Sequence, residues 1–153
     1  MRADARWVSQ HWWSGSFELM SGDDQVASVR IKGSHGTAEI GGRQYVLERF
    51  RLPPCITIRD ADSDELAVRC CLIPQRGGLL AEFRDGESFH LGWVRWWKRE
   101  WVWTDDAGEP VLSFRRPWFE NRRDLNIEPA ADRETWPLLA VLEIAGKLAI
   151  PWF

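Results

Sequence analysis

The 153-residue chain lacks a large excess of charge of either sign and lacks a long apolar run. Its formal net charge is −3, whereas a nucleic-acid-binding domain is usually basic, so we expect no nucleic-acid partner. The longest apolar stretch, within residues 137–150, is about a dozen residues long, and a bilayer-spanning helix needs roughly 20. We therefore expect a protein that is not integral to a membrane.

Cysteine is also scarce. The three cysteines are Cys55, Cys70 and Cys71, and an odd count with an adjacent pair is not typical of a disulfide framework. Adjacent residues of a strand also point to opposite faces. We expect three reduced thiols and hence a cytoplasmic location, which agrees with a polar, charged stretch at 1–13 that has no apolar signal-peptide core.

Short runs of alternating apolar and polar residues are abundant. They fill residues 12–128 and are separated by turn residues about every eight to twelve positions, which is typical of antiparallel strands. A loose repeat of strand, acidic turn and strand occurs at 58–68, 83–91 and 103–114, and we interpret it as a series of hairpins. The pattern predicts about eleven strands.

The end of the chain, residues 134–150, is predicted to be a helix that is apolar on nearly every side. Only Glu143 and Lys147 interrupt it, Pro137 suits a first turn, and Pro151 ends it. A helix that is apolar all round must be buried all round. We therefore predict a mainly β fold, a closed antiparallel barrel of about 11–12 strands enclosing this helix, as a single domain over 1–153. A filled barrel leaves no central cavity for a ligand.

This element order resembles the tubby-like superfamily, which includes the tubby C-terminal domain, the phospholipid scramblases and the LURP-one-related proteins. The resemblance covers residues 12–150 and includes the phrases Ile58-Arg59-Asp60-Ala61-Asp62 and Trp103-Thr104-Asp105-Asp106-Ala107-Gly108. It implies a barrel of about a dozen strands with the last helix along its axis. The phosphoinositide-binding basic residues of tubby domains have no matching positions here, and Cys70-Cys71 lies mid-strand, unlike the palmitoylated clusters of scramblases. The resemblance therefore implies a fold rather than an activity.

A calcium site is one interpretation of Asp60, Asp62 and Asp64, whose spacing opens an EF-hand loop. Such a loop needs Gly at its sixth position and Glu at its twelfth, where this chain has Glu65 and Cys71. An acidic hairpin turn is the better interpretation.

Zinc and catalytic patterns are also poorly supported. His11, His35 and His90 are far apart and no Cys-x-x-Cys occurs. Ser34 and His35 are neighbours in a glycine-flanked turn, but no third group to orient them is indicated. We expect no metal, no cofactor and no catalytic residue, although an enzyme with an external cleft stays an alternative.

Tryptophan and arginine concentrate in two segments. Residues 93–103 hold five of the 11 tryptophans with a local charge of +2, and residues 115–124 hold four arginines and again +2. Indoles beside cations suit the bilayer interface, and arginine forks match phosphate oxygens. We predict a non-enzymatic binding module, peripheral to a membrane, that recognises anionic phospholipid headgroups or a protein partner. The candidate residues are Arg95, Trp96, Trp97, Lys98, Arg99, Arg115, Arg116, Arg122 and Arg123. The alternative is a structural or protein-interaction protein with no small ligand, in which the tryptophans serve as packing.

Overall fold

A computed structural model describes residues 3–8, 15–51, 54–73, 78–95, 100–115, 123–127 and 135–149. Within these ranges the chain forms twelve strands followed by one helix. The strands are β1 (Ala3–Val8), β2 (Ser16–Ser21), β3 (Asp24–Lys32), β4 (His35–Ile40), β5 (Arg43–Arg51), β6 (Pro54–Asp60), β7 (Leu66–Leu72), β8 (Leu79–Phe83), β9 (Ser88–Arg95), β10 (Glu100–Asp105), β11 (Pro110–Arg115) and β12 (Arg123–Ile127), and the helix is α1 (Thr135–Ala149). The predicted mainly β fold with one C-terminal helix is confirmed.

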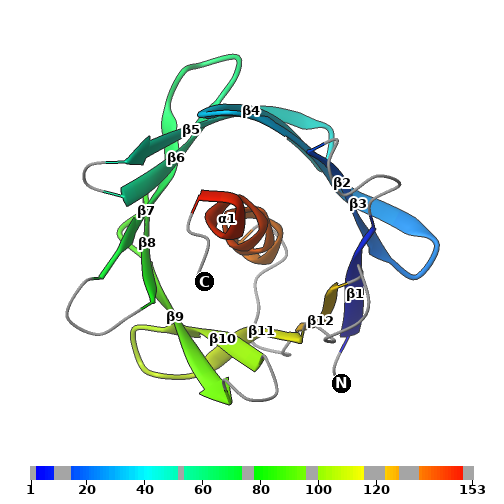
Figure 1. Ribbon diagram of the computed structural model, residues 1–153, viewed down its shortest axis with the longest axis vertical. Coiled ribbons are helices and arrows are strands. Elements are labelled where there is room, and N and C mark those ends of the chain that lie inside the picture. Colours follow the sequence, from blue (N-terminus) through cyan, green and yellow to red (C-terminus); the bar gives the residue numbers. More distant parts are fainter. Residues whose placement is uncertain are drawn as a thin grey trace.

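Every strand pairs antiparallel with its neighbours in the chain, and the strands surround α1 (Figure 1). β1 pairs with β12 over five residue pairs, from Ala3↔Ile127 to Trp7↔Arg123, and with β2 over three. β1, the first strand, therefore has the last strand β12 on one side and β2 on the other.

The strand β1 was missed by the sequence analysis, which started the strands near residue 12. Its pattern is short: Ala5 and Trp7 are buried, whereas Asp4, Arg6 and Val8 are exposed. Two apolar positions are too few to distinguish a strand from an irregular terminus. Pairing with β12 and β2 supplies the backbone partners that make this segment a strand.

Helix α1 is buried on every side over the part whose side chains are described. Leu139, Leu142 and Ala145 have no exposed surface, and Ile144 is 1 % exposed. The helix contacts β3, β4, β6 and β11, which lie on different sides of it in Figure 1. Glu143, which was expected only to interrupt the apolar surface, is also fully buried. The interior is therefore occupied by the helix and the inward side chains of the strands.

Four tryptophans belong to this core, Trp7, Trp101, Trp103 and Trp136. Trp7, Trp101 and Trp103 are at most 1 % exposed, and the ring of Trp101 stacks on that of Phe114 with centroids 6.1 Å apart. A fully buried aromatic side chain removes a large apolar area from water. Trp101 and Trp103 are thus packing residues, which corrects their inclusion in a surface over 93–103.

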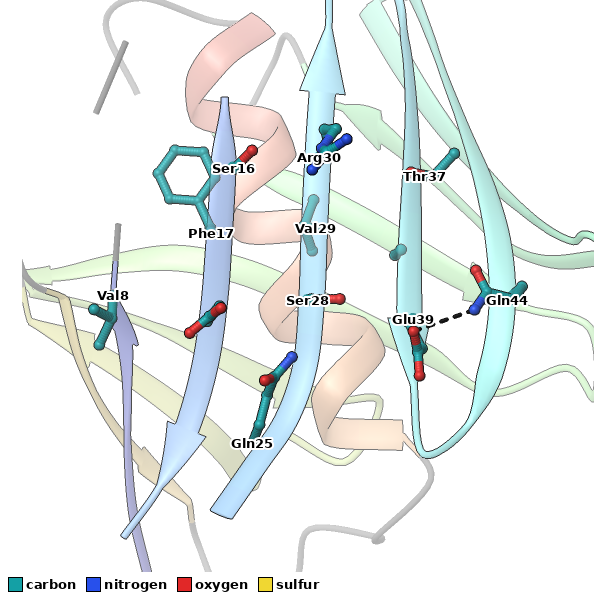
Figure 2. A pocket seen from close by; sticks show the side chains of 12 residues that line it. Val8, Ser16, Phe17, Gln25, Ser28, Val29, Arg30, Thr37, Glu39 and Gln44 are labelled. Carbon is teal, nitrogen blue, oxygen red and sulfur yellow. Dashed lines mark hydrogen bonds between the residues drawn. The ribbon is translucent and has the colours of Figure 1, made fainter. Parts of the chain in front are cut away.

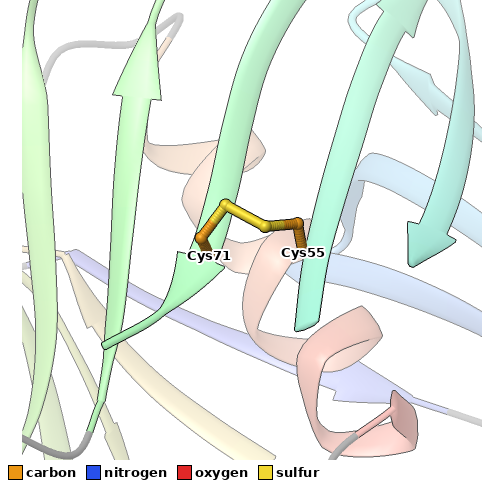
Figure 3. Close-up of a disulfide and its surroundings, with 2 residues drawn as sticks. All are labelled: Cys55 and Cys71. Carbon is orange, nitrogen blue, oxygen red and sulfur yellow. A yellow bond between two sulfur atoms is a disulfide. The ribbon is translucent and has the colours of Figure 1, made fainter. Parts of the chain in front are cut away.

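The cysteines differ from expectation, because Cys55 and Cys71 form a disulfide (Figure 3). These two residues face each other in the register of β6 and β7, with Cα atoms 4.1 Å apart. The prediction of three reduced thiols was wrong. Cys55 and Cys71 are 16 residues apart in the chain, and it is the register of β6 with β7 that brings them together. Cys70 does face away from Cys71 into the core, where burial raises the pKa of its thiol. The expected cytoplasmic location therefore no longer has the support of three reduced thiols.

The repeated acidic turns are hairpin turns, as interpreted from the sequence. In each of three turns an aspartate Oδ1 accepts hydrogen bonds from backbone amides two to four residues later, the local geometry for which Asp is favoured. These bonds come from Asp62 and Ser63 to Asp60, from Glu87 to Asp85, and from Ala107 and Glu109 to Asp105, at 2.8–3.2 Å.

Candidate functional site

The predicted Trp/Arg surface lies partly outside the described residues. Trp96, Trp97, Lys98, Arg99, Arg116 and Arg122 fall outside them, and Arg95 and Arg123 are described only in their backbone. The connection from β9 to β10 and the connection from β11 to β12 leave the same end of the strands, because each strand is antiparallel to its neighbours. The described strand ends that flank these two segments therefore lie at one end of the fold.

The strand ends beneath these connections form a row of alternating charge. In register across five strands stand Arg95 of β9, Glu100 of β10, Arg115 of β11, Asp124 of β12 and Arg6 of β1. Arg6 and Arg115 are exposed. Opposite charges in cross-strand positions stabilise a sheet by roughly 0.2–1 kcal/mol per pair. Among the side chains described, Glu100 and Arg115 are such a pair.

An outer pocket of about 430 Å³, here called the arginine pocket, contains one predicted residue, Arg115. Its lining residues are Asp4, Ala5, Arg6, Met20, Gly22, Arg115 and Leu125. The backbone oxygen of Asp4 accepts a hydrogen bond from the Ser21 hydroxyl at 3.3 Å, which ties β1 to the end of β2. The pocket brings two exposed guanidinium groups from opposite ends of the chain to one site.

Sequence reasoning missed Arg6 because it assigned no strand to residues 3–8. The alternation of Asp4, Ala5, Arg6 and Trp7 was the available signal, since it places Arg6 on the outer face. Its nearness to Arg115 depends on the pairing of β1 with β12, which no local pattern reveals.

A second and larger hollow of about 640 Å³, here called the β2–β5 groove, lies over β2, β3, β4 and β5 (Figure 2). It is lined by Val8, Ser16, Phe17, Glu18, Gln25, Ser28, Val29, Arg30, Thr37, Ala38, Glu39 and Gln44. Glu18, Arg30 and Glu39 are its charged residues, and all three are exposed. None of them was singled out from the sequence, because they carry no motif and are nine or more residues apart along the chain.

The calcium interpretation gains no support from the geometry of the acidic turn. The Asp60 carboxylate accepts hydrogen bonds from the backbone amides of Ser63 and Asp62, and these bonds hold the pKa of this carboxyl below its ordinary value of 3.8. In the described ranges no three His, Cys, Asp or Glu residues are grouped so that they could hold a metal ion.

The Ser34–His35 pair lies where the chain turns from β3 into β4. Ser34 and His35 are both exposed, and the backbone oxygen of Ser34 accepts a hydrogen bond from the amide of Arg49 at 2.8 Å. In register, His35 faces Lys32 and Glu48.

In the portion of the chain that is described, no helix combines the length and apolarity needed to cross a membrane.

Comparison with known proteins identifies a similar fold. The chain matches the crystal structure of a protein from Arabidopsis thaliana with a TM-score of 0.67 and 14 % identity, covering 95 % of this chain and 90 % of that one. At this identity the likeness shows the fold alone. No protein-family model matches the chain, and no curated protein matches it.

Proposed function

We propose that this protein is a non-enzymatic binding module that recognises anionic phospholipid headgroups at the end of the fold where the 96–99 and 116–122 connections emerge. The observation that supports this most directly is the arginine pocket, in which Arg6 and Arg115 line one outer hollow. Arginine presents its donors as a planar fork that binds two phosphate oxygens at once. Two forks from different strands suit a phosphate group better than either one alone.

The proposal places the ligand on the outside because α1 fills the interior. We further propose that the ring of strands is a closed barrel in solution and that the protein is a tubby-like domain. The shortest ladder beside β1 is the three-pair contact with β2. Amide hydrogen exchange tests closure at this seam: protection of Trp7 and Leu19 is expected, and fast exchange of both would mean an open sheet.

The acidic neighbours of the arginines do not prevent anion binding. Asp4 lines the same pocket and Glu100 faces Arg115 in register. Exposed ion pairs contribute only about 0–1 kcal/mol, so a phosphate can displace such a carboxylate at small cost. The tryptophans and cations predicted at 96–99 would add contacts at headgroup depth.

Vesicle co-sedimentation tests the proposal. The protein should sediment with vesicles of phosphatidylcholine mixed with phosphatidylserine and not with phosphatidylcholine alone, and the binding should weaken as salt is raised. Each basic residue near an anionic surface contributes about 1 kcal/mol, so Arg6→Gln and Arg115→Gln should each weaken binding about fivefold. The matched control is Arg69→Gln, an exposed arginine of β7 outside the pocket. Equal sedimentation with both vesicle types, or equal loss in the control, would refute the proposal.

The connections need their own test, because they carry most of the predicted residues. The variant Trp96→Ser/Trp97→Ser should lose binding to anionic vesicles, and Lys98→Gln/Arg99→Gln should lose its salt dependence. Unchanged binding in both variants would restrict the proposed site to Arg6 and Arg115.

A structural or protein-interaction role with no small ligand is the second candidate. It is favoured by the burial of Trp7, Trp101 and Trp103, which shows that part of the tryptophan content serves packing. Acrylamide quenching separates the two, because full protection of the Trp96 and Trp97 fluorescence would leave neither of these indoles for a membrane.

The proposed location is the cytoplasmic face of a membrane, and the Cys55–Cys71 disulfide is the observation against it, since disulfides persist in oxidising compartments. Alkylation of thiols in intact cells, followed by mass spectrometry of both cysteines, decides between them.

A further inference from the structure

The β2–β5 groove has a lining chemistry that differs from that of the arginine pocket. Its volume of about 640 Å³ accommodates a small molecule, and its charged residues, two glutamates and one arginine, leave a charge of −1. The other polar groups are hydroxyls and amides, which both donate and accept hydrogen bonds. A groove with both signs of charge selects for a ligand with both signs.

The acidic half of the groove is built across three strands. Ser28 of β3 faces Glu18 of β2 on one side and Glu39 of β4 on the other. Neighbouring strands are about 4.7–4.9 Å apart, so the Cα atoms of the two glutamates are roughly 10 Å apart with the short serine between them. Gln44 Nε2 donates a hydrogen bond to Glu39 Oε2 at 3.2 Å, which holds this carboxylate beside the groove (Figure 2).

This arrangement fits a primary ammonium group. An ammonium has three donors and no acceptor, and here it would meet two carboxylates and one hydroxyl, all of which accept. Charge-assisted hydrogen bonds of this kind are stronger than neutral ones.

The basic half of the groove is Arg30, two residues along β3 from Ser28 and on the same outer face. This step along a strand is roughly 6.8 Å. Ser16 and Thr37 face Arg30 in register from β2 and β4, and both are short enough to leave its guanidinium accessible. A guanidinium binds a carboxylate with two parallel hydrogen bonds.

We propose that the β2–β5 groove binds a short free peptide in its zwitterionic form. The terminal ammonium of the peptide lies between Glu18 and Glu39, and its terminal carboxylate reaches Arg30. This site is separate from the proposed headgroup site, shares no residue with the arginine pocket and needs no membrane. The two proposals can therefore fail independently.

Backbone amide NMR of the full chain, titrated with glycylglycine at neutral pH and constant ionic strength, tests the proposal. Saturable shifts are expected at Glu18, Ser28, Arg30 and Glu39. N-acetylglycylglycine lacks the ammonium and glycylglycinamide lacks the carboxylate, and each should bind several-fold more weakly. No shifts, shifts elsewhere, or equal binding of all three peptides would overturn the proposal. Binding of the amide as tight as that of the parent peptide would also overturn it, because the ligand would then be a simple cation.

Substitutions assign the two halves of the groove. Glu18→Gln and Glu39→Gln keep the side-chain shape, remove one charge, and should each weaken glycylglycine binding about two- to fivefold. Arg30→Gln should remove the preference for glycylglycine over glycylglycinamide. Glu82→Gln is the matched control, since Glu82 is an exposed glutamate on β8 outside the groove, and it should bind like the parent chain. All these side chains are exposed, so native spectra are expected, and equal losses in the control would refute a specific site.

Discussion

Alanine substitutions on three sides of α1 test whether strands enclose this helix. Leu139, Leu142 and Ile144 are each at most 1 % exposed. Successive residues of a helix are about 100° apart, so these three point roughly 0°, 300° and 140° around the axis. A helix lying on a sheet would have one wet side, where a substitution costs little.

The expected cost follows from the carbon atoms removed. Leucine to alanine deletes three buried groups at about 0.8 kcal/mol each, or about 2.4 kcal/mol, and the cavity left behind raises the total into a range of about 2–5 kcal/mol. Ile144→Ala belongs to the same range. Each variant should therefore lower the free energy of unfolding by about 2–5 kcal/mol, whichever side of the helix it is on.

Urea denaturation followed by tryptophan fluorescence measures this loss. With a slope of about 2 kcal/mol per molar urea, the midpoint should fall by about 1 M or more at an unchanged slope. Val8→Ala, at a side chain 37 % exposed, is the control and should cost less than about 0.5 kcal/mol. A loss below about 0.5 kcal/mol at any of the three helix positions would refute enclosure, and with it the exclusion of an internal ligand.

Three further predictions concern the strands and turns. Reducing the Cys55–Cys71 bridge should lower the free energy of unfolding by about 3 kcal/mol, because the bridge joins positions 16 residues apart; coincident urea curves with and without dithiothreitol would contradict this. The Asp60 carboxylate should stabilise its hairpin fully above its ordinary pKa of 3.8, with the contribution lost as pH falls through the lower folded-state pKa. Carbon-detected NMR titration of this carboxyl checks the direction, and a midpoint above 3.8 would contradict it. Gly15→Ala should destabilise more than Gly22→Ala by about 1 kcal/mol or more in thermal unfolding, and equal losses would contradict this. Both glycines have positive φ (70° and 64°), but only at Gly15 would a Cβ collide with a backbone oxygen, that of Ile31.

Local patterns were enough to predict the helix and every strand except β1. Period-2 alternation identified most strands because each strand has one face toward the core, and the aspartate turns were recognisable because their hydrogen bonds are made within a few residues. The helix over 134–150 was predictable because its apolar residues surround its axis, which leaves burial on all sides as the only stable outcome.

Pairing between distant strands was not predictable from such patterns. The bridge between Cys55 and Cys71 depends on the register of β6 with β7, and the arginine pocket depends on β1 pairing with β12. Likewise, Glu18, Ser28 and Glu39 become neighbours only through the register of β2, β3 and β4.

Apart from β1, the amino-acid sequence therefore determined which segments are strands, turns or helix and which of their faces are apolar, since these properties depend on neighbours a few residues away. Only the tertiary structure decided which side chains share the outer hollows, because contacts across a sheet are set by strand order and register, and one residue of slippage would turn every side chain to the other face.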